Sequence, residues 1–135
     1  ASAVRAALPE PPSVYFRQNC FVGASFLSNW EAKFCIEHGL ASNAMWGDDY
    51  PHAEGAWPHT RQAMQFTFHD IDETHTRQYL GETAIDVYGL DRAALAQVAA
   101  EIGPTVAEIA TPVDVPDDDD AVGLYAFRTG PGIFV

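Results

Sequence analysis

The middle of the chain reads Ala44-Met45-Trp46-Gly47-Asp48-Asp49-Tyr50-Pro51-His52. Its apolar start predicts a buried strand, and Pro51 rules out a helix directly afterwards because a proline ring disfavours helical backbone in the preceding residue. The two aspartates therefore follow the carboxyl end of a strand. In α/β folds ligands bind outside the carboxyl ends of the strands. Asp48 and Asp49 are consequently candidates for a metal ligand or a general base.

The sequence before this strand predicts a second strand and a helix that connects the two. Residues 20–24 are strand formers, and we expect them to be buried on both faces, as parallel sheets covered by helices require. Ser28 and Glu31 have the spacing of a capping box, which predicts the start of a helix that Gly39 ends. The order strand, helix, strand is that of a βαβ unit, so the strands at 20–24 and 43–46 should be parallel.

The sequence after the aspartates predicts a loop over residues 50–59 and then helices. Loops of this length without periodicity are usually functional or disordered, and the aromatic residues in this one favour order. Capping residues and apolar spacing predict helices over residues 61–68, 72–88, 92–102 and 106–109. Thr60 should cap the first and Asp91 the third, while Asp72 and Glu73 lie near the start of the second, where the helix dipole favours acids.

The composition limits the classes of partner. The chain has 135 residues, 47% of them apolar, which suits one domain with a core. Its net charge of -12 argues against binding to nucleic acids or anionic membranes. Without an apolar run of spanning length or a signal-peptide core, we expect a soluble, cytoplasmic chain with Cys20 and Cys35 as reduced thiols. The first residue is Ala1, which leaves open that the chain is a processed, trimmed or excised piece.

The residue spacing alone leaves the chemistry open. Asp49 is either a metal ligand or a turn carboxylate that accepts hydrogen bonds from backbone amides. His52 and His59 are seven residues apart in a loop and form no HxH or HExxH pattern. Arg61 suits either a substrate carboxylate or a salt bridge on a helix surface. The remaining histidines are expected on solvent-facing helix surfaces: His38, His69 and His75.

Several motifs resemble one family in both order and spacing. Residues 46–52 (WGDDYPH) and the following 54–60 (EGAWPHT) resemble the eighth-strand region of the amidohydrolase-related family. This family includes aminocarboxymuconate semialdehyde decarboxylase. The family's seventh strand is similar to residues 15–26, its closing helix to residues 80–90, and its C-terminal extension to residues 102–105. The resemblance therefore covers nearly the whole chain.

The resemblance implies roles for individual residues. Asp49 corresponds to the strand-eight aspartate of the family, which binds the metal or serves as a general base, and His52 borders the same pocket as a second catalytic candidate. Trp57, His59 and Arg61 are the substrate-binding candidates. The implied cofactor is a divalent metal, zinc or manganese, for which Asp49 is the ligand in this chain. Asp48 stands where the family commonly has Ser or Thr, so which aspartate faces the site stays open, although the register favours Asp49.

The resemblance also predicts that the chain is incomplete as an enzyme. The family binds its metal with histidines from early strands of an eight-stranded barrel, whereas this sequence predicts two strands and contains no HxH. We therefore expect an α/β fold, the C-terminal part of a (β/α)8 TIM-barrel-like metal-dependent hydrolase, over residues 1–110. An acidic tail and an apolar arm with an extended C-terminus are expected over residues 111–135. The remainder of the barrel or a partner chain should complete a homo- or hetero-oligomer, and the isolated chain should be inactive.

The expected function is that of a metal-dependent hydrolase or decarboxylase acting on a small carboxylated or cyclic substrate. The alternative is a non-catalytic binding or oligomerisation module derived from the same fold. The sequence leaves open the substrate, the metal, the choice between hydrolysis and decarboxylation, and the role of Asp117–Asp120. The adjacent aspartates of that run lack the alternating spacing of a calcium loop.

Overall fold

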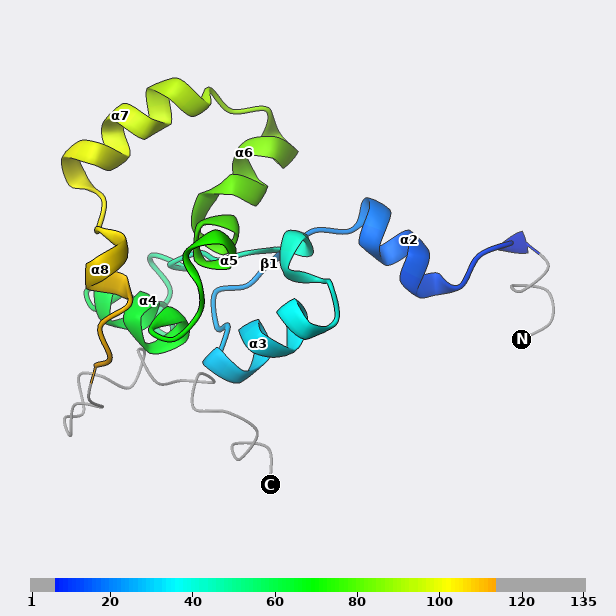
Figure 1. Ribbon diagram of the computed structural model, residues 1–135, viewed down its shortest axis with the longest axis horizontal. Helices are drawn as coiled ribbons and strands as arrows, with labels where there is room; N and C mark the ends of the chain where they lie inside the picture. Colours follow the sequence, from blue (N-terminus) through cyan, green and yellow to red (C-terminus); the bar gives the residue numbers. More distant parts are fainter. Residues whose placement is uncertain (1–6, 114–135) are drawn as a thin grey trace.

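The protein has an α/β fold in which helices outnumber a single pair of strands (Figure 1). A computed structural model describes residues 7–113. The elements in chain order are α2 (Pro12–Asn19), β1 (Val22–Gly23), α3 (Asn29–Glu37), η1 (Ala41–Asn43), β2 (Ala44–Met45), α4 (Thr60–Phe68), α5 (Glu73–Arg77), η2 (Gln78–Glu82), α6 (Thr83–Tyr88), α7 (Arg92–Ile102) and α8 (Val106–Ile109). No helix in residues 7–113 is long and apolar enough to cross a membrane.

The two strands pair in parallel, as the βαβ order predicts. Val22 lies opposite Ala44 and Gly23 opposite Met45, and the pairing continues in a 2.8 Å hydrogen bond from the Ala24 amide to the Met45 carbonyl. The buried Asn43 fixes the approach to β2, because its side-chain amide donates to backbone carbonyls at the end of α2. The pair is shorter than the predicted strands over residues 20–24 and 43–46.

The expectation that the first strand is buried on both faces is wrong. Phe21 and Val22 are each 44% exposed, and Gly23 is exposed as well. The faces of a parallel sheet are buried by the helices that pack over them. In residues 7–113 the α5–α6 run packs on β2, and the side chains of β1 stay exposed. Apolar residues that suit the interior of a sheet therefore remain in contact with water.

Local capping forms α3 as the sequence predicts. The Ser28 hydroxyl accepts from the Glu31 amide, the Glu31 carboxylate accepts from the Ser28 amide, and Gly39 follows the helix with a φ of 65°. A glycine adopts this left-handed conformation without a steric penalty from Cβ. The capping box and the glycine thus set both ends of the helix that connects the strands.

The helical run from α5 through α6 closes against the other edge of β2. Gly89, with a φ of 62°, ends it as predicted, and Asp72, expected near its start, is the N-cap residue. The π-helical segment η2 lies in its middle, and the Tyr79 carbonyl accepts a 2.9 Å hydrogen bond from the Trp46 amide. Because alternate backbone groups of a strand point to opposite edges, this bond occupies the side of β2 that faces away from β1.

The core lies where α3, α4, the α5–α6 run and β2 meet. Tyr79 is 1% exposed, packs on Phe68 with ring centroids 5.6 Å apart, and donates a 2.9 Å hydrogen bond to the Ala32 carbonyl. The main cluster of buried apolar residues comprises Leu27, Ala32, Ala41, Ala44, Phe68, Ile71, Tyr79 and Ile109. Half-buried Cys35 and Trp46 pack against it, which agrees with Cys35 as a reduced thiol.

The helices at the C-terminal end of the described region differ in their packing. Asp91 caps α7 as predicted, but none of the residues of α7 is buried, and Figure 1 shows this helix away from the strands. The α8 helix begins at a capping box of Thr105 and Glu108 and packs on α4. Of the acidic tail and apolar arm predicted over residues 111–135, residues 111–113 are described, and Asp117–Asp120 and the whole arm lie outside the described residues.

Candidate functional site

The candidate site begins where β2 ends. Asp49 is the one residue other than glycine in 7–113 with a positive φ, at 64°, and its side chain is 25% exposed. The Asp49 carboxylate lies 2.9 Å from His52 Nδ1, and the His52 amide donates a 2.9 Å hydrogen bond to the Asp49 carbonyl. Asp49 and His52, the two predicted catalytic residues, are thus brought together in one tight turn.

The charge of Asp49 affects the ionisation of its partner. His52 is exposed, and its pKa is raised because its ring hydrogen-bonds to the Asp49 carboxylate and is attracted by the same charge. The imidazolium form is therefore favoured beside an ionised aspartate. In this arrangement Asp49 can accept a proton or coordinate a cation through its remaining lone pairs, whereas the ring nitrogen facing it acts as a hydrogen-bond donor.

Asp48 points to a different part of the molecule. The Thr60 hydroxyl donates to Asp48 Oδ2, while Asp48 Oδ1 is buried and has no hydrogen-bond partner in residues 7–113. The prediction that Thr60 caps the following helix is wrong: His59 occupies the N-cap position and Thr60 is the first residue of α4. The Thr60 hydroxyl is engaged instead by Asp48, twelve residues earlier in the chain.

The loop between Asp49 and α4 folds back on the end of β2. The Ala56 amide donates a 2.8 Å hydrogen bond to the Asp48 carbonyl, and Ala56 packs with Ala63 and Trp46. A Cβ atom on Gly55 would lie 2.9 Å from the Asp49 carbonyl oxygen and 3.0 Å from that of Asp48. Only a glycine lets the backbone approach this closely, so the loop depends on residue 55.

The three predicted substrate-binding residues lie on the outside of this loop and of α4. Trp57 is 64% exposed and meets Tyr50 edge to face, with ring centroids 5.6 Å apart. His59 is half-buried, and its amide donates to the Ala56 carbonyl. Arg61 forms a 2.8 Å ion pair with Glu108, which is the helix-surface alternative that the sequence left open.

The other histidines stay with their own helices. Ring nitrogens of His38 and His69 lie within hydrogen-bond distance of backbone carbonyls four residues earlier, and His75 Nδ1 is 2.5 Å from Asp72 Oδ2. In the part of the chain that the structure describes, no group of three or more His, Cys, Asp or Glu side chains could hold a metal ion. The Asp49 and His52 pair is therefore not a complete metal site within residues 7–113.

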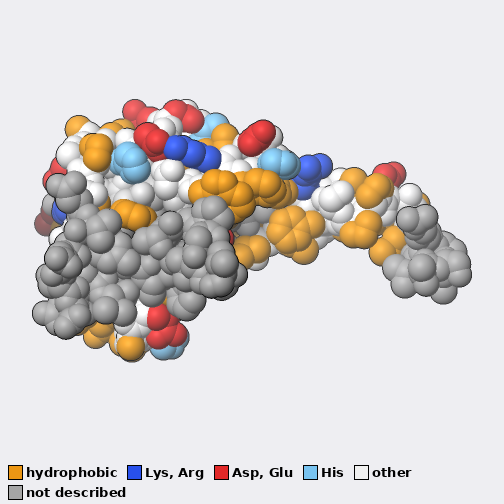
Figure 2. Space-filling model, turned by 90° about the horizontal axis from the view of Figure 1, so that it is seen from below, with side chains coloured by type: hydrophobic (Ala, Val, Ile, Leu, Met, Phe, Trp, Pro, Cys, Tyr) orange, Lys and Arg blue, Asp and Glu red, His pale blue; other side chains and the backbone are white. Residues whose placement is uncertain are grey.

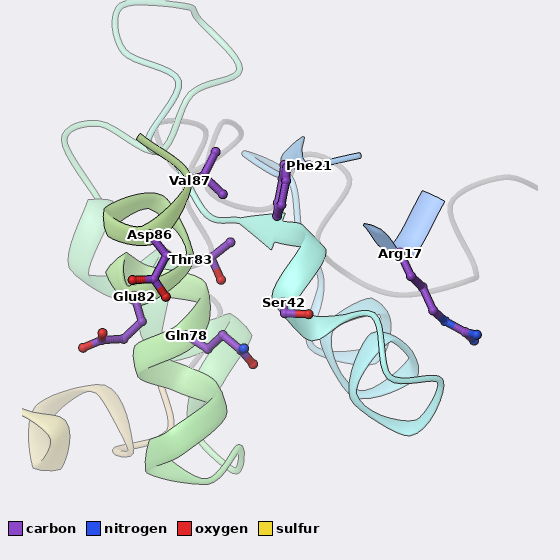
Figure 3. Close-up of a pocket in the computed structure, with 8 residues that line it drawn as sticks. All are labelled: Arg17, Phe21, Ser42, Gln78, Glu82, Thr83, Asp86 and Val87. Carbon is purple, nitrogen blue, oxygen red and sulfur yellow. The ribbon is translucent and has the colours of Figure 1, made fainter. Parts of the chain in front are cut away.

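A hollow in the described residues lies elsewhere. It has a volume of about 340 Å³ between the N-terminal segments and the α5–α6 run. Its lining residues are Arg17, Phe21, Ser42, Gln78, Glu82, Thr83, Asp86 and Val87. Figure 3 shows the Arg17 guanidinium pointing away from Glu82 and Asp86, and both of these acids pair with Arg92. None of the predicted site residues lines this hollow, and its charged groups do not converge.

A scan of family models and searches of curated proteins and of solved structures found no match to this chain.

The geometry contains two features that the sequence did not predict: the hydrogen bond from Thr60 to Asp48 and the close backbone approach at Gly55. The glycine could have been noticed as the one residue of its loop free of Cβ. Nothing in the sequence indicates the long-range partner of Thr60.

Proposed function

We propose that this chain supplies Asp49 to the site of a metal-dependent hydrolase or decarboxylase similar to the amidohydrolase-related family, with a small carboxylated or cyclic molecule as substrate. The observation that carries the proposal is the position of Asp49 in the turn that follows the parallel strand β2, four residues after Met45, with its carboxylate paired to His52 and a quarter exposed. Acids at the carboxyl ends of parallel strands are where α/β enzymes place their reactive groups.

The roles proposed for the remaining residues follow from the resemblance to the family. His52 holds the Asp49 carboxylate by a hydrogen bond. Trp57 and His59 border the substrate from the loop, and Arg61 would offer its guanidinium to a substrate carboxylate after releasing Glu108. Zinc or manganese is the proposed cofactor, with Asp49 as one ligand and the further ligands supplied from outside residues 7–113.

The same proposal requires a partner that completes the sheet. The edge of β1 is unpaired within residues 7–113, and the side chains of Phe21 and Val22 next to it are apolar and exposed. Figure 2 shows hydrophobic side chains gathered over the middle of one face, where α3 lies in Figure 1, and continuing toward α2. Two parallel strands cannot close a barrel. We propose that further strands, from the remainder of the barrel or from a partner chain, pair with this edge.

One observation favours the second candidate function, a non-catalytic oligomerisation module. The α7 helix carries exposed apolar side chains at helical spacing, Leu95, Val98 and Ile102, and buries none of its residues. An amphipathic helix with an uncovered apolar side is a common surface for association. In that case the assembly would form through α7 and would need no ligand at Asp49.

The test is a comparison of variants in the assembly isolated with its partner strands. Its rates of substrate hydrolysis and of carbon dioxide release are measured on a panel of small carboxylated and cyclic compounds, together with its metal content. We expect Asp49→Ala to lower turnover by roughly 10² to 10⁴, the range for a group that takes part in acid–base chemistry. The matched control is Asp86→Ala, which removes an exposed aspartate that pairs with Arg92.

The two candidate functions give opposite results. The proposed enzyme loses activity or metal with Asp49→Ala and keeps both with Asp86→Ala, while the fold measured by circular dichroism stays unchanged. An assembly that contains no divalent metal and turns over none of the panel, with or without Asp49, would contradict the proposal and favour the oligomerisation module.

A further inference from the structure

The segment from Asp48 to Thr60 contains two hydrogen bonds that have no part in the roles proposed above. Asp48 is bonded at two points to the far end of the loop that follows it: its carboxylate accepts from the Thr60 hydroxyl, and its carbonyl accepts from the Ala56 amide. Asp48 alone therefore connects the start of the loop that contains Asp49 and His52 to residues near its end. Breaking either bond would leave one of these two connections in place.

The carboxylate of Asp48 is unsuited to be a ligand at the outer surface of the loop. One of its oxygens is engaged by Thr60, and the other is buried without a partner in residues 7–113. Its neighbour Thr60 is the first residue of α4, and the positive end of a helix stabilises a nearby carboxylate. The inward-pointing acid at position 48 therefore has a hydrogen-bond donor in Thr60.

The backbone of Asp49 needs such support. A residue with a Cβ atom pays a steric cost in the left-handed conformation, and such residues persist where the surrounding structure fixes them. Asp49 has a φ of 64°, and its carbonyl and carboxylate both bond to His52. His52 itself is exposed. The buried attachment of this turn therefore lies on the other side of Asp49, at Asp48.

From these contacts we infer that Asp48 is a positioning residue for Asp49: the hydrogen bond between the Thr60 hydroxyl and the Asp48 carboxylate holds the turn of Asp49 and His52 in its left-handed conformation. The functional meaning of this inference rests on the proposed role of Asp49. The conformational claim stands apart from it and is measured without any activity assay.

The experiment measures amide hydrogen exchange by NMR in the 135-residue chain. Thr60→Val and Asp48→Ala break the same bond from opposite sides, whereas Thr60→Ser keeps a hydroxyl donor. The matched control is Thr111→Val, which removes a threonine hydroxyl that bonds to the Ala107 carbonyl on α8. Exchange is followed at the His52 and Ala56 amides in the turn, and at the Trp46 amide, which is bonded to Tyr79.

We expect Thr60→Val and Asp48→Ala to speed exchange at His52 and Ala56 roughly tenfold, which corresponds to about 1.4 kcal/mol, while exchange at Trp46 changes little. Thr60→Ser should restore slow exchange, and Thr111→Val should leave exchange at all three amides unchanged.

The inference is upheld if at least one of the two bond-breaking variants speeds exchange at His52 and Ala56 but not at Trp46. It is overturned if neither does, either because exchange stays slow in the turn or because it rises equally at Trp46, as a purely structural role would cause. Inactivity of the complete assembly would leave this result unchanged and would count against the proposed function alone.

Discussion

At the scale of single residues, the candidate site depends on a few close approaches that the sequence only partly predicts. The prediction of a turn carrying two acids follows from Gly47 and Pro51, because their backbone preferences are local. The direction of Asp48 is not local, because it bonds to Thr60, twelve residues away, whereas Asp49 bonds to His52 within its own turn. Local secondary-structure propensities carry no information about a hydrogen bond between residues so far apart. The sequence could therefore identify the two aspartates as candidates but could not assign their separate contacts.

Gly55 provides the clearest stability prediction at this scale. Gly55→Ala places a Cβ within 3.0 Å of three carbonyl oxygens, and we expect the resulting overpacking to lower the free energy of unfolding by about 1 to 3 kcal/mol. The control is Gly81→Ala: Gly81 lies in the helical run and a Cβ there meets no atom within 4 Å. That change should raise stability by about 0.5 to 1 kcal/mol. Urea unfolding monitored by tryptophan fluorescence measures both, and a neutral Gly55→Ala would show that the loop is not held as described.

At the scale of secondary-structure elements, the sequence predicts the features that neighbouring residues determine. The capping box at Ser28, the cap at Asp91 and the glycine at position 89 are confirmed because each bond joins residues two to five positions apart. The prediction that β1 is buried was wrong, since burial depends on which distant helices cover the faces of the strand. The π-helical turn at Tyr79 was not predicted either, because its carbonyl is drawn to the Trp46 amide of a distant strand.

The attachment of α8 should depend on pH through Glu108. The pKa of Glu108 is lowered, first because its carboxylate accepts from the Thr105 amide, then because it accepts from the Thr105 hydroxyl, and also through Arg61. A carboxyl group whose pKa is depressed by folding stabilises the fold above its unfolded pKa, near 4.5, and loses this contribution as the pH falls through its lower folded value. We therefore expect protection of the Ile109 amide from exchange, corrected for the intrinsic rate, to fall in that acidic range. Glu108→Gln should remove the pH dependence, and an unchanged profile in that variant would exclude Glu108 as its origin.

At the scale of the whole molecule, the described residues expose more apolar surface than their packing uses. Phe21 and Val22 lie next to the unpaired edge of β1, and Leu95, Val98 and Ile102 lie along α7. The sequence indicated an incomplete sheet from its count of two strands, and the structure has two parallel strands in residues 7–113. Which apolar surface meets a partner is a property of the assembly, which one chain's sequence does not encode locally.

The two surfaces can be separated by adding a charge to each. Phe21→Lys should abolish assembly if further strands pair at β1, because a lysine there opposes edge pairing. Leu95→Lys on α7 is the matched control and should leave assembly intact. Both side chains are exposed, so each variant should retain its own stability within about 0.5 kcal/mol. Light scattering after size-exclusion chromatography measures the assembly, and the reverse order of effects would favour association through α7.

The central claim is that Asp49 contributes a ligand to a metal site completed by other chain segments, and anomalous diffraction from crystals of the complete assembly grown with zinc tests it most directly. We predict a zinc peak about 2.0 to 2.2 Å from an Asp49 carboxylate oxygen, with the remaining ligands from outside residues 7–113. A zinc site elsewhere, with the Asp49 carboxylate facing bulk water and bonded only to His52, would contradict it.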